Sequence, residues 1–249
     1  MVNKQRGFTL VEIAIVLVII GLLLGGILKG QELITAARVR NLASQAAGVQ
    51  TAYYGFVDRY RAVPGDMQGT QACTAISNTV CGVGGNGNGT IASSTSTTDP
   101  TPWTEASAAW AHMAAAGFLQ GNYAGTATAD GTTGGAYRDL TILQAPINTF
   151  NGFLLLATTS EYSPAGLAPR LHLITGREVP VNVMREMDVK MDDSLPNTGI
   201  LRSAPQTATA AFPGFVGSSD PTTRCVSTAT PPAWNITGAS ADCNGYFLY

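Results

Sequence analysis

Little of this sequence is charged, and the residue patterns that identify common enzymes are missing. Charged residues make up 12% of the 249 residues, which suits a polar but weakly charged surface outside the cytoplasm. A phosphate-binding loop needs Lys followed by Ser or Thr after its glycines, and the stretch GNGNGTI lacks that pair. Ser218 and Ser219 lack the Gly-x-Ser-x-Gly elbow of hydrolases. The sequence therefore predicts neither nucleotide binding nor serine-based hydrolysis.

Histidine and clustered basic residues are also scarce. The two histidines, His112 and His172, lie far apart and have no cysteine or carboxylate at zinc-ligand spacing. We expect packed or surface imidazoles at both positions. No basic stripe is present, so we expect no nucleic acid on the folded part of the chain. Together these absences predict that the chain is not an enzyme.

The longest apolar run, Phe8 to Leu28, contains one charged residue, Glu12. At 1.5 Å per residue, about 21 residues cover a bilayer core of roughly 30 Å. A carboxylate at that depth costs roughly 2.5 to 3.5 kcal/mol, so we expect Glu12 to have a partner and a function. Lys4 and Arg6 precede the run, and the positive-inside rule then leaves the chain's start in the cytoplasm and places everything after Leu28 across the membrane.

A partner for Glu12 would arise if the chain were cut after Gly7. Residues 1–7 are a short basic leader ending in a small residue, and the apolar region follows the cut, whereas in an ordinary secretory signal it precedes the cut. Cleavage between Gly7 and Phe8 would create an amino group about one helical turn before Glu12. That amine and the carboxylate could pair within one chain, or between neighbouring chains staggered by about one turn.

The stretch GFTLVE, followed by an apolar helix, resembles the class III signal of type IV pilins and type II secretion pseudopilins. The resemblance implies cleavage after Gly7 by a prepilin peptidase, N-methylation of Phe8, and pairing of Glu12 with the amine of a neighbouring subunit in a filament. It also implies other partners, namely further pilins, an assembly ATPase and an inner-membrane platform. The alternative is a signal anchor that merely contains an acid.

The resemblance, together with composition, predicts what the filament subunit does and where it resides. We expect a structural subunit of a type IV pilus-like filament, in the inner membrane with a periplasmic head before assembly. After assembly it would lie in a filament at the cell surface or in the periplasm. Two alternatives remain: a type II secretion pseudopilin, or a minor tip pilin that acts as an adhesion or DNA-binding module.

The predicted fold class is α+β, with a long N-terminal helix packed on an antiparallel sheet. Three parts are expected: a leader at 1–7, the helix at 8–61 with 8–28 in the membrane or filament core, and a globular head at 62–249. Apolar residues four and three apart predict that the helix continues past the membrane, and Pro64-Gly65 ends it. The other expected elements are a helix at 105–116 capped by Thr104, strands at 153–158 and 171–175, a helix at 181–191, a strand at 200–203 and an edge strand at 246–249.

Four cysteines fit an oxidising compartment. They fall into two pairs close in sequence, Cys73 with Cys81 and Cys225 with Cys243. Four cysteines permit three connectivities, of which we favour the two local bonds, and free buried thiols are the alternative.

Calcium is the one ligand that the sequence suggests, and no other cofactor is expected. Asn86 and Asn88 alternate with glycines as in oxygen-rich calcium loops, and Asp66, Asp192 and Asp193 could supply carboxylates. The asparagine loop has no carboxylate of its own, so a tight site would need aspartates brought in by folding. Ordinary turns are the alternative.

Overall fold

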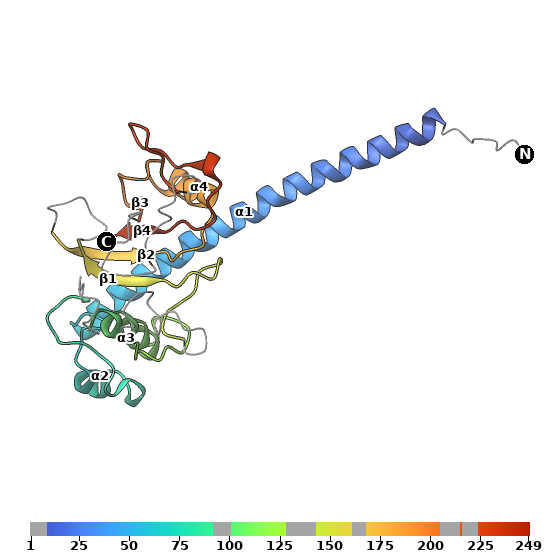
Figure 1. Ribbon diagram of the computed structural model, residues 1–249. Helices are drawn as coiled ribbons and strands as arrows, with labels where there is room; N and C mark the ends of the chain where they lie inside the picture. The colour runs from blue at the N-terminus through green and yellow to red at the C-terminus, as the bar shows by residue number, and fades with distance from the viewer. Residues whose placement is uncertain (1–8, 92–100, 128–142, 161–167, 205–214, 216–223) are drawn as a thin grey trace, which may run out of the picture. The chain divides into compact units, whose positions relative to one another are not determined.

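The long N-terminal helix α1 spans Leu10–Tyr60 in a computed structural model of the chain (Figure 1). The structure describes residues 9–91, 101–127, 143–160, 168–204, 215 and 224–249. The chain forms two compact units, Met1–Arg38 and Val39–Tyr249, and α1 contributes to both. The second unit, the head, therefore includes the second half of α1.

The second half of α1 supplies one wall of the head's core. Its buried residues recur three or four apart, as the sequence pattern predicts: Val39, Leu42, Ala46, Val49, Ala52 and Phe56. Tyr53 and Tyr60 continue the same spacing and are partly buried against the core. The helix ends at Tyr60, after which Arg61 adopts a left-handed backbone with φ of 53° and Pro64 follows.

A four-stranded antiparallel sheet forms the centre of the head. Its strands are β1 (Leu155–Thr159), β2 (Arg170–Ile174), β3 (Leu201–Ser203) and β4 (Gly245–Leu248), in the spatial order β1-β2-β4-β3. The prediction of an edge strand at 246–249 is wrong, because β4 lies between β2 and β3. Just after β4, the Tyr249 hydroxyl donates to the Ala46 carbonyl of α1 at 3.0 Å. This contact ties the C-terminal strand to the N-terminal helix.

Helices flank both edges of the sheet (Figure 1). α3 (Thr101–Ala115) contacts β1, and α4 (Val181–Met191) contacts β3. A shorter helix, α2 (Gly69–Ala75), precedes α3. Thr104 was expected to cap the helix but lies within it, and its hydroxyl donates to the Ala127 carbonyl at 3.2 Å. Two 3-10 turns complete the described elements, η1 (Asn78–Val80) and η3 (Ile236–Gly238).

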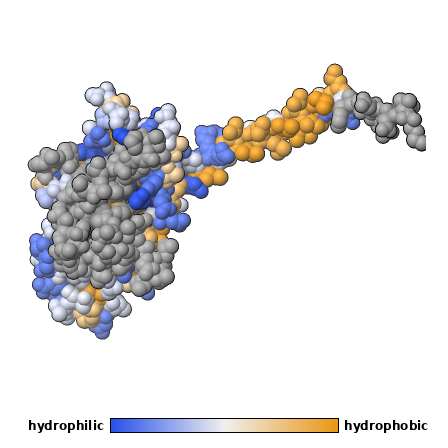
Figure 2. All heavy atoms as spheres, viewed as in Figure 1, coloured by the Kyte–Doolittle hydropathy of each residue, from blue (hydrophilic) through white to orange (hydrophobic). Residues whose placement is uncertain are grey.

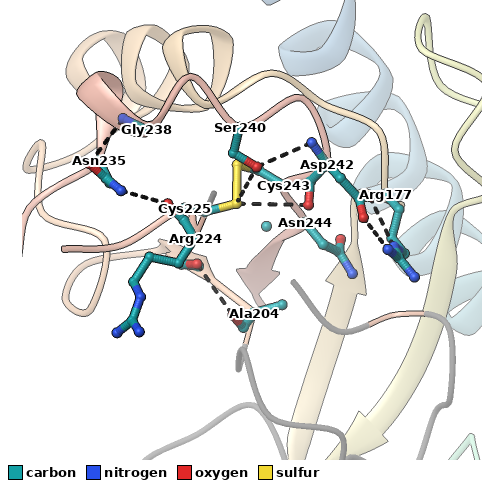
Figure 3. Close-up of a disulfide and its surroundings, with 12 residues drawn as sticks. Arg177, Ala204, Arg224, Cys225, Asn235, Gly238, Ser240, Asp242, Cys243 and Asn244 are labelled. Carbon is teal, nitrogen blue, oxygen red and sulfur yellow. Dashed lines mark hydrogen bonds and ion pairs between the residues drawn. A yellow bond between two sulfur atoms is a disulfide. The ribbon is translucent and has the colours of Figure 1, made fainter. Parts of the chain in front are cut away.

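Two disulfides connect loops of the head, and they are the two local pairs that the sequence favours. Cys73 bonds Cys81, and Cys225 bonds Cys243. Beside the second disulfide, Arg177 makes a two-pronged ion pair with Asp242, its Nε donating to Oδ1 at 2.9 Å (Figure 3). The disulfide and the ion pair together anchor the segment that leads into β4.

Candidate functional site

The candidate assembly site is the first half of α1, and it begins with a reciprocal cap. Thr9 Oγ1 accepts the Glu12 backbone N–H at 3.3 Å, and Glu12 Oε2 accepts from the Thr9 backbone N–H at 2.8 Å and from the Thr9 hydroxyl at 2.7 Å. This is the capping-box arrangement, in which the residue before the helix and the third helical residue satisfy each other's N–H groups. Glu12 therefore has a local partner within its own chain.

The apolar side chains of this segment are exposed on every side of the helix. None of its most hydrophobic stretch of 18 residues is buried inside the structure. Figure 2 shows apolar residues along this part of α1. The large exposed ones are Leu10, Val11, Ile13, Ile15, Val16, Leu17, Val18, Ile19, Ile20, Leu22, Leu23, Leu24, Ile27 and Leu28. Among the described residues, α1 alone is long and apolar enough to cross a membrane.

Small residues on this segment would let another helix approach it closely. A Cβ added at Gly21, Gly25 or Gly26 would meet no atom within 4 Å apart from its own helix backbone. Small residues spaced four apart let two helices in an apolar environment come close together. Nearer the cap, apolar side chains form a shallow groove along one side of the helix: Leu10, Val11, Ala14, Ile15, Val18 and Ile19. Both features suit packing against other helices.

Charge returns where the apolar run stops. Lys29 Nζ lies 2.7 Å from Glu32 Oε2, and both side chains are well exposed. Such a pair marks the end of the segment that is suited to a bilayer core. The predicted processing residues Gly7 and Phe8 lie outside the described residues, so the proposed cut and the Phe8 amine stay predictions.

Residues 2–28 match the family described as the prokaryotic N-terminal methylation motif. No curated protein and no solved structure matches the chain significantly. The chain thus carries a prepilin signal of the type found in type IV pilins and pseudopilins. With its long apolar helix and four-stranded antiparallel sheet, it has an α+β, pilin-like architecture.

Of the carboxylates predicted to complete a calcium site, Asp66 lies against the asparagine loop, but the oxygens there already accept hydrogen bonds. Asp66 is buried, and its carboxylate accepts backbone N–H groups of Gly87 at 2.8 Å, Asn88 at 2.9 Å and Gly89 at 2.7 Å. Asn86 Oδ1 accepts from the Asn88 backbone at 3.0 Å. These contacts describe a loop anchored on a carboxylate. Calcium at Asp66, Asn86 and Asn88 stays an untested prediction.

His112 is a buried connector between three segments of the head. Its Nδ1 accepts the Gly65 N–H at 3.1 Å, and its Nε2 lies 2.8 Å from the Val83 carbonyl, to which it donates. The ring is stacked on Phe56 of α1 at 6.2 Å between centroids. Burial lowers the pKa of His112, although the bond to Val83 opposes this effect. Because Nδ1 accepts a hydrogen bond, the ring is the neutral imidazole with its proton on Nε2, as expected for a packed histidine.

One group of acidic residues was only partly anticipated. Asp192 and Asp193 follow α4, and Asp188 lies one turn earlier on the same helix. A carboxylate oxygen of each lies within 4.8 Å of an oxygen of each of the others. Asp188 was missed, although its spacing of four and five residues from the other two places it at the same helix end. Burial raises the pKa of Asp188, and so do the charges of Asp193 and Asp192, whereas bonds from Trp234 and the Ser194 backbone lower it.

Proposed function

We propose that this chain is a structural subunit of a type IV pilus-like filament and that it polymerises through the first half of α1. The methylation motif at residues 2–28 carries this proposal. The exposed apolar surface from Leu10 to Leu28 supports it, because such a surface needs lipid before assembly and other helices afterwards. Exchanging lipid for neighbouring helices keeps the apolar surface out of water in both states.

Maturation would alter the surroundings of Glu12. In the uncleaved chain Glu12 is bound by Thr9. Cleavage between Gly7 and Phe8 by a prepilin peptidase would release a methylated amine beside that cap. In a filament, the Glu12 carboxylate would then neutralise the Phe8 amine of a neighbouring subunit. In apolar surroundings, a carboxylate or amine without its partner would be a buried, unpaired charge, which is strongly destabilising. The pairing would therefore favour the one stagger between subunits that brings the two groups together.

A subunit of this kind would work within a larger machine. Before assembly the apolar segment holds the subunit in the inner membrane, with the head in the periplasm. An assembly ATPase and a membrane platform would lift the subunits, and the heads would cover the outside of the filament. A structural role of this kind requires no catalytic residue in the chain.

Replacement of Glu12 tests the proposal directly. Cells expressing wild type or Glu12→Ala are compared by electron microscopy of sheared surface material and by mass spectrometry of the chain's N-terminus. We expect wild-type filaments whose subunits begin at methylated Phe8, and a loss of about tenfold or more in the mutant, because an unpaired buried amine costs several kcal/mol. Glu32→Gln is the matched control, since Glu32 is an exposed acid on the same helix, and we expect it to assemble normally.

Two results would contradict this function. An uncleaved chain that stays monomeric would remove the filament proposal, and so would assembly that is indifferent to Glu12. Filaments confined to the periplasm, with a defect in protein secretion when the gene is deleted, would instead favour a type II secretion pseudopilin. Labelling confined to filament tips would favour a minor pilin.

A further inference from the structure

The dipeptide Asn-Gly occurs four times in the chain, and two of these sites lie in the loop that Asp66 anchors. The four asparagines are Asn86, Asn88, Asn151 and Asn244. At such a site the backbone nitrogen of the glycine can attack the side-chain carbonyl carbon of the asparagine, because glycine has no side chain to hinder the approach. Each site is therefore a point at which the chain can be modified without an enzyme.

The modification is deamidation, which needs only water. The glycine nitrogen bonds to the side-chain carbon, the bond from that carbon to the side-chain nitrogen breaks, and this nitrogen leaves as ammonia with the proton that the glycine nitrogen has lost. The product is a cyclic imide. Water then opens the ring at either carbonyl carbon, which gives aspartate or isoaspartate. The first step requires a glycine N–H that is free to turn towards the asparagine side chain.

In all four pairs the glycine N–H instead donates to a side-chain oxygen. The bonds run from Gly87 to Asp66 Oδ1 at 2.8 Å, from Gly89 to Asp66 Oδ2 at 2.7 Å, from Gly152 to Asn148 Oδ1 at 3.0 Å and from Gly245 to Thr175 Oγ1 at 3.1 Å. A nitrogen held in this way must give up its bond before it can attack. The free energy of the bond is thereby added to the barrier of the reaction.

The two sites in the loop differ from the other two in their exposure. Asn86, Asn88 and the glycine after each are exposed, so water can reach an imide there and ammonia can leave. At Asn151 and Asn244 the following glycine is buried. Burial protects those two sites in addition to the hydrogen bond, whereas the sites in the loop rely on the hydrogen bond alone.

The backbone of the loop depends on the same residues that make it reactive. Gly87 and Gly89 have φ of 79° and 89°, in the left-handed region that favours glycine. Asn86 Oδ1 accepts the Asn88 backbone N–H at 3.0 Å. Asn88 Oδ1 accepts the Thr90 backbone N–H at 3.0 Å and the Thr90 hydroxyl at 2.8 Å. Asparagine side chains and glycines together shape these turns, so the chemical stability of the loop depends on what holds the glycine N–H groups.

We propose that Asn88 is a latent deamidation site and that Asp66 is the residue that suppresses the reaction there. The buried Asp66 carboxylate accepts the backbone N–H groups of residues 87–89. While it holds the Gly89 N–H, the nitrogen cannot turn towards the Asn88 side chain. The negative charge of the carboxylate also opposes loss of the proton, because that loss would leave a second negative charge beside it.

Asn88 depends on the Asp66 side chain more than Asn86 does. The Gly87 N–H also donates to the backbone carbonyl of Asp66 at 3.0 Å, and this bond does not involve the side chain. The Gly89 N–H is bonded to the carboxylate. Loss of the carboxylate should therefore free the nitrogen next to Asn88 first.

Deamidation at Asn88 would release the loop from its anchor. It would place a second carboxylate beside Asp66, and the two like charges would repel each other. An isoaspartate would also lengthen the backbone at this point and displace the Gly89 N–H from its acceptor. Neither the site nor its protection depends on filament assembly, so the test is separate from that of Glu12.

The test follows deamidation site by site in the full chain, folded in detergent and kept in warm, mildly alkaline buffer. Tandem mass spectrometry assigns each modified residue, and wild type unfolded in urea gives the unprotected rate at each site. We expect Asn88 in the folded wild type to react about tenfold or more slowly than in urea, because a charge-assisted hydrogen bond must first be broken. Asp66→Asn should raise the rate at Asn88 by about tenfold or more, while Asn151 and Asn244 stay protected.

Two further variants separate local protection from general stability. Asp192→Asn is the matched control, because Asp192 Oδ2 also accepts backbone N–H groups of a turn, and that turn has no Asn-Gly pair. We expect it to leave the rate at Asn88 unchanged. Asp66→Glu keeps the charge but moves the oxygens by one methylene, so we expect a smaller rise confined to Asn88. Circular dichroism melts of each variant show whether the head is folded.

Three results would overturn the proposal. Asn88 in the folded wild type could react as fast as in urea. Asp66→Asn and Asp66→Glu could both leave Asn88 intact. Finally, both variants could speed the reaction at Asn244 as much as at Asn88, which would mean that Asp66 stabilises the head as a whole and gives no local protection.

Discussion

The two halves of α1 have the same backbone and opposite surfaces. From Leu10 to Leu28 large apolar side chains are exposed all around the helix, whereas from Val39 to Phe56 they form one buried stripe. A helix that is apolar on all sides needs an apolar environment from outside the chain, and a helix with one apolar stripe needs only its own domain. One continuous helix thus combines a segment whose apolar side chains are exposed with a segment whose apolar stripe is buried in the head.

The largest difference between the halves should appear when a large side chain is truncated. Phe56→Ala should lower the free energy of unfolding of the head by about 3 to 5 kcal/mol, because Phe56 is fully buried and its loss leaves a cavity. Leu17→Ala, in the exposed half, should change it by less than about 0.5 kcal/mol. Denaturant unfolding in detergent, followed by tryptophan fluorescence of the head, measures both. Equal losses of unfolding free energy in the two variants would contradict the difference between the two halves of α1.

Covalent cross-links sharpen the same contrast, because both disulfides belong to the head. Replacing Cys225 and Cys243 together by alanine should cost about 3 kcal/mol, since the bond closes a loop of 18 residues. Replacing Cys73 and Cys81 should cost less, because that loop is 8 residues long. Circular dichroism melts report the head's stability, while detergent extraction reports the membrane segment. A change in extraction without a change in melting would contradict this assignment.

The smallest expected effect is a pH dependence confined to the head. Burial lowers the pKa of His112 below its ordinary value of 6.5, so the unfolded chain binds this proton more readily than the folded one. The folded state therefore has its full stability, as far as His112 is concerned, above pH 6.5. Part of the free energy of unfolding is lost as the pH falls below that value, because the unfolded chain then takes up the proton first. Between pH 7 and 5.5 we expect wild type to lose more stability than His112→Gln, measured by denaturant unfolding at each pH. Parallel losses would show that other groups, such as His172 with its lowered pKa, account for the dependence.

Local patterns were enough to predict much of the fold. The stripe on α1 gave its path to Tyr60, and the predicted helix at 181–191 matches α4. Apolar runs bounded by turn residues gave β1 and β2 to within two residues. In the site, Glu12 stood out because it is the single charge in an apolar run. Its Thr9 partner follows the capping-box spacing but was not foreseen.

Other features depend on contacts that sequence spacing does not contain. The interior place of β4 follows from pairing with β2 on one side and β3 on the other, both distant in sequence. α3 begins at Thr101, before the predicted start at residue 105, because Pro102 suits the first turn of a helix. The role of Asp66 as a loop anchor depends on backbone N–H groups of residues 87–89, which appear only once the loop has folded.

The position of β4 also sets an order of events during synthesis. β1 and β2 are near neighbours in sequence and can pair as soon as both have been made. β3 is completed at Ser203, yet the strand it pairs with begins at Gly245. Until that later segment has left the ribosome, β3 has no strand of the sheet to pair with. In a nascent chain stalled before Gly245, β1 and β2 could pair, but β2 would have one unpaired edge and β3 would have no partner. Chaperones and proteases could then reach these unpaired strands.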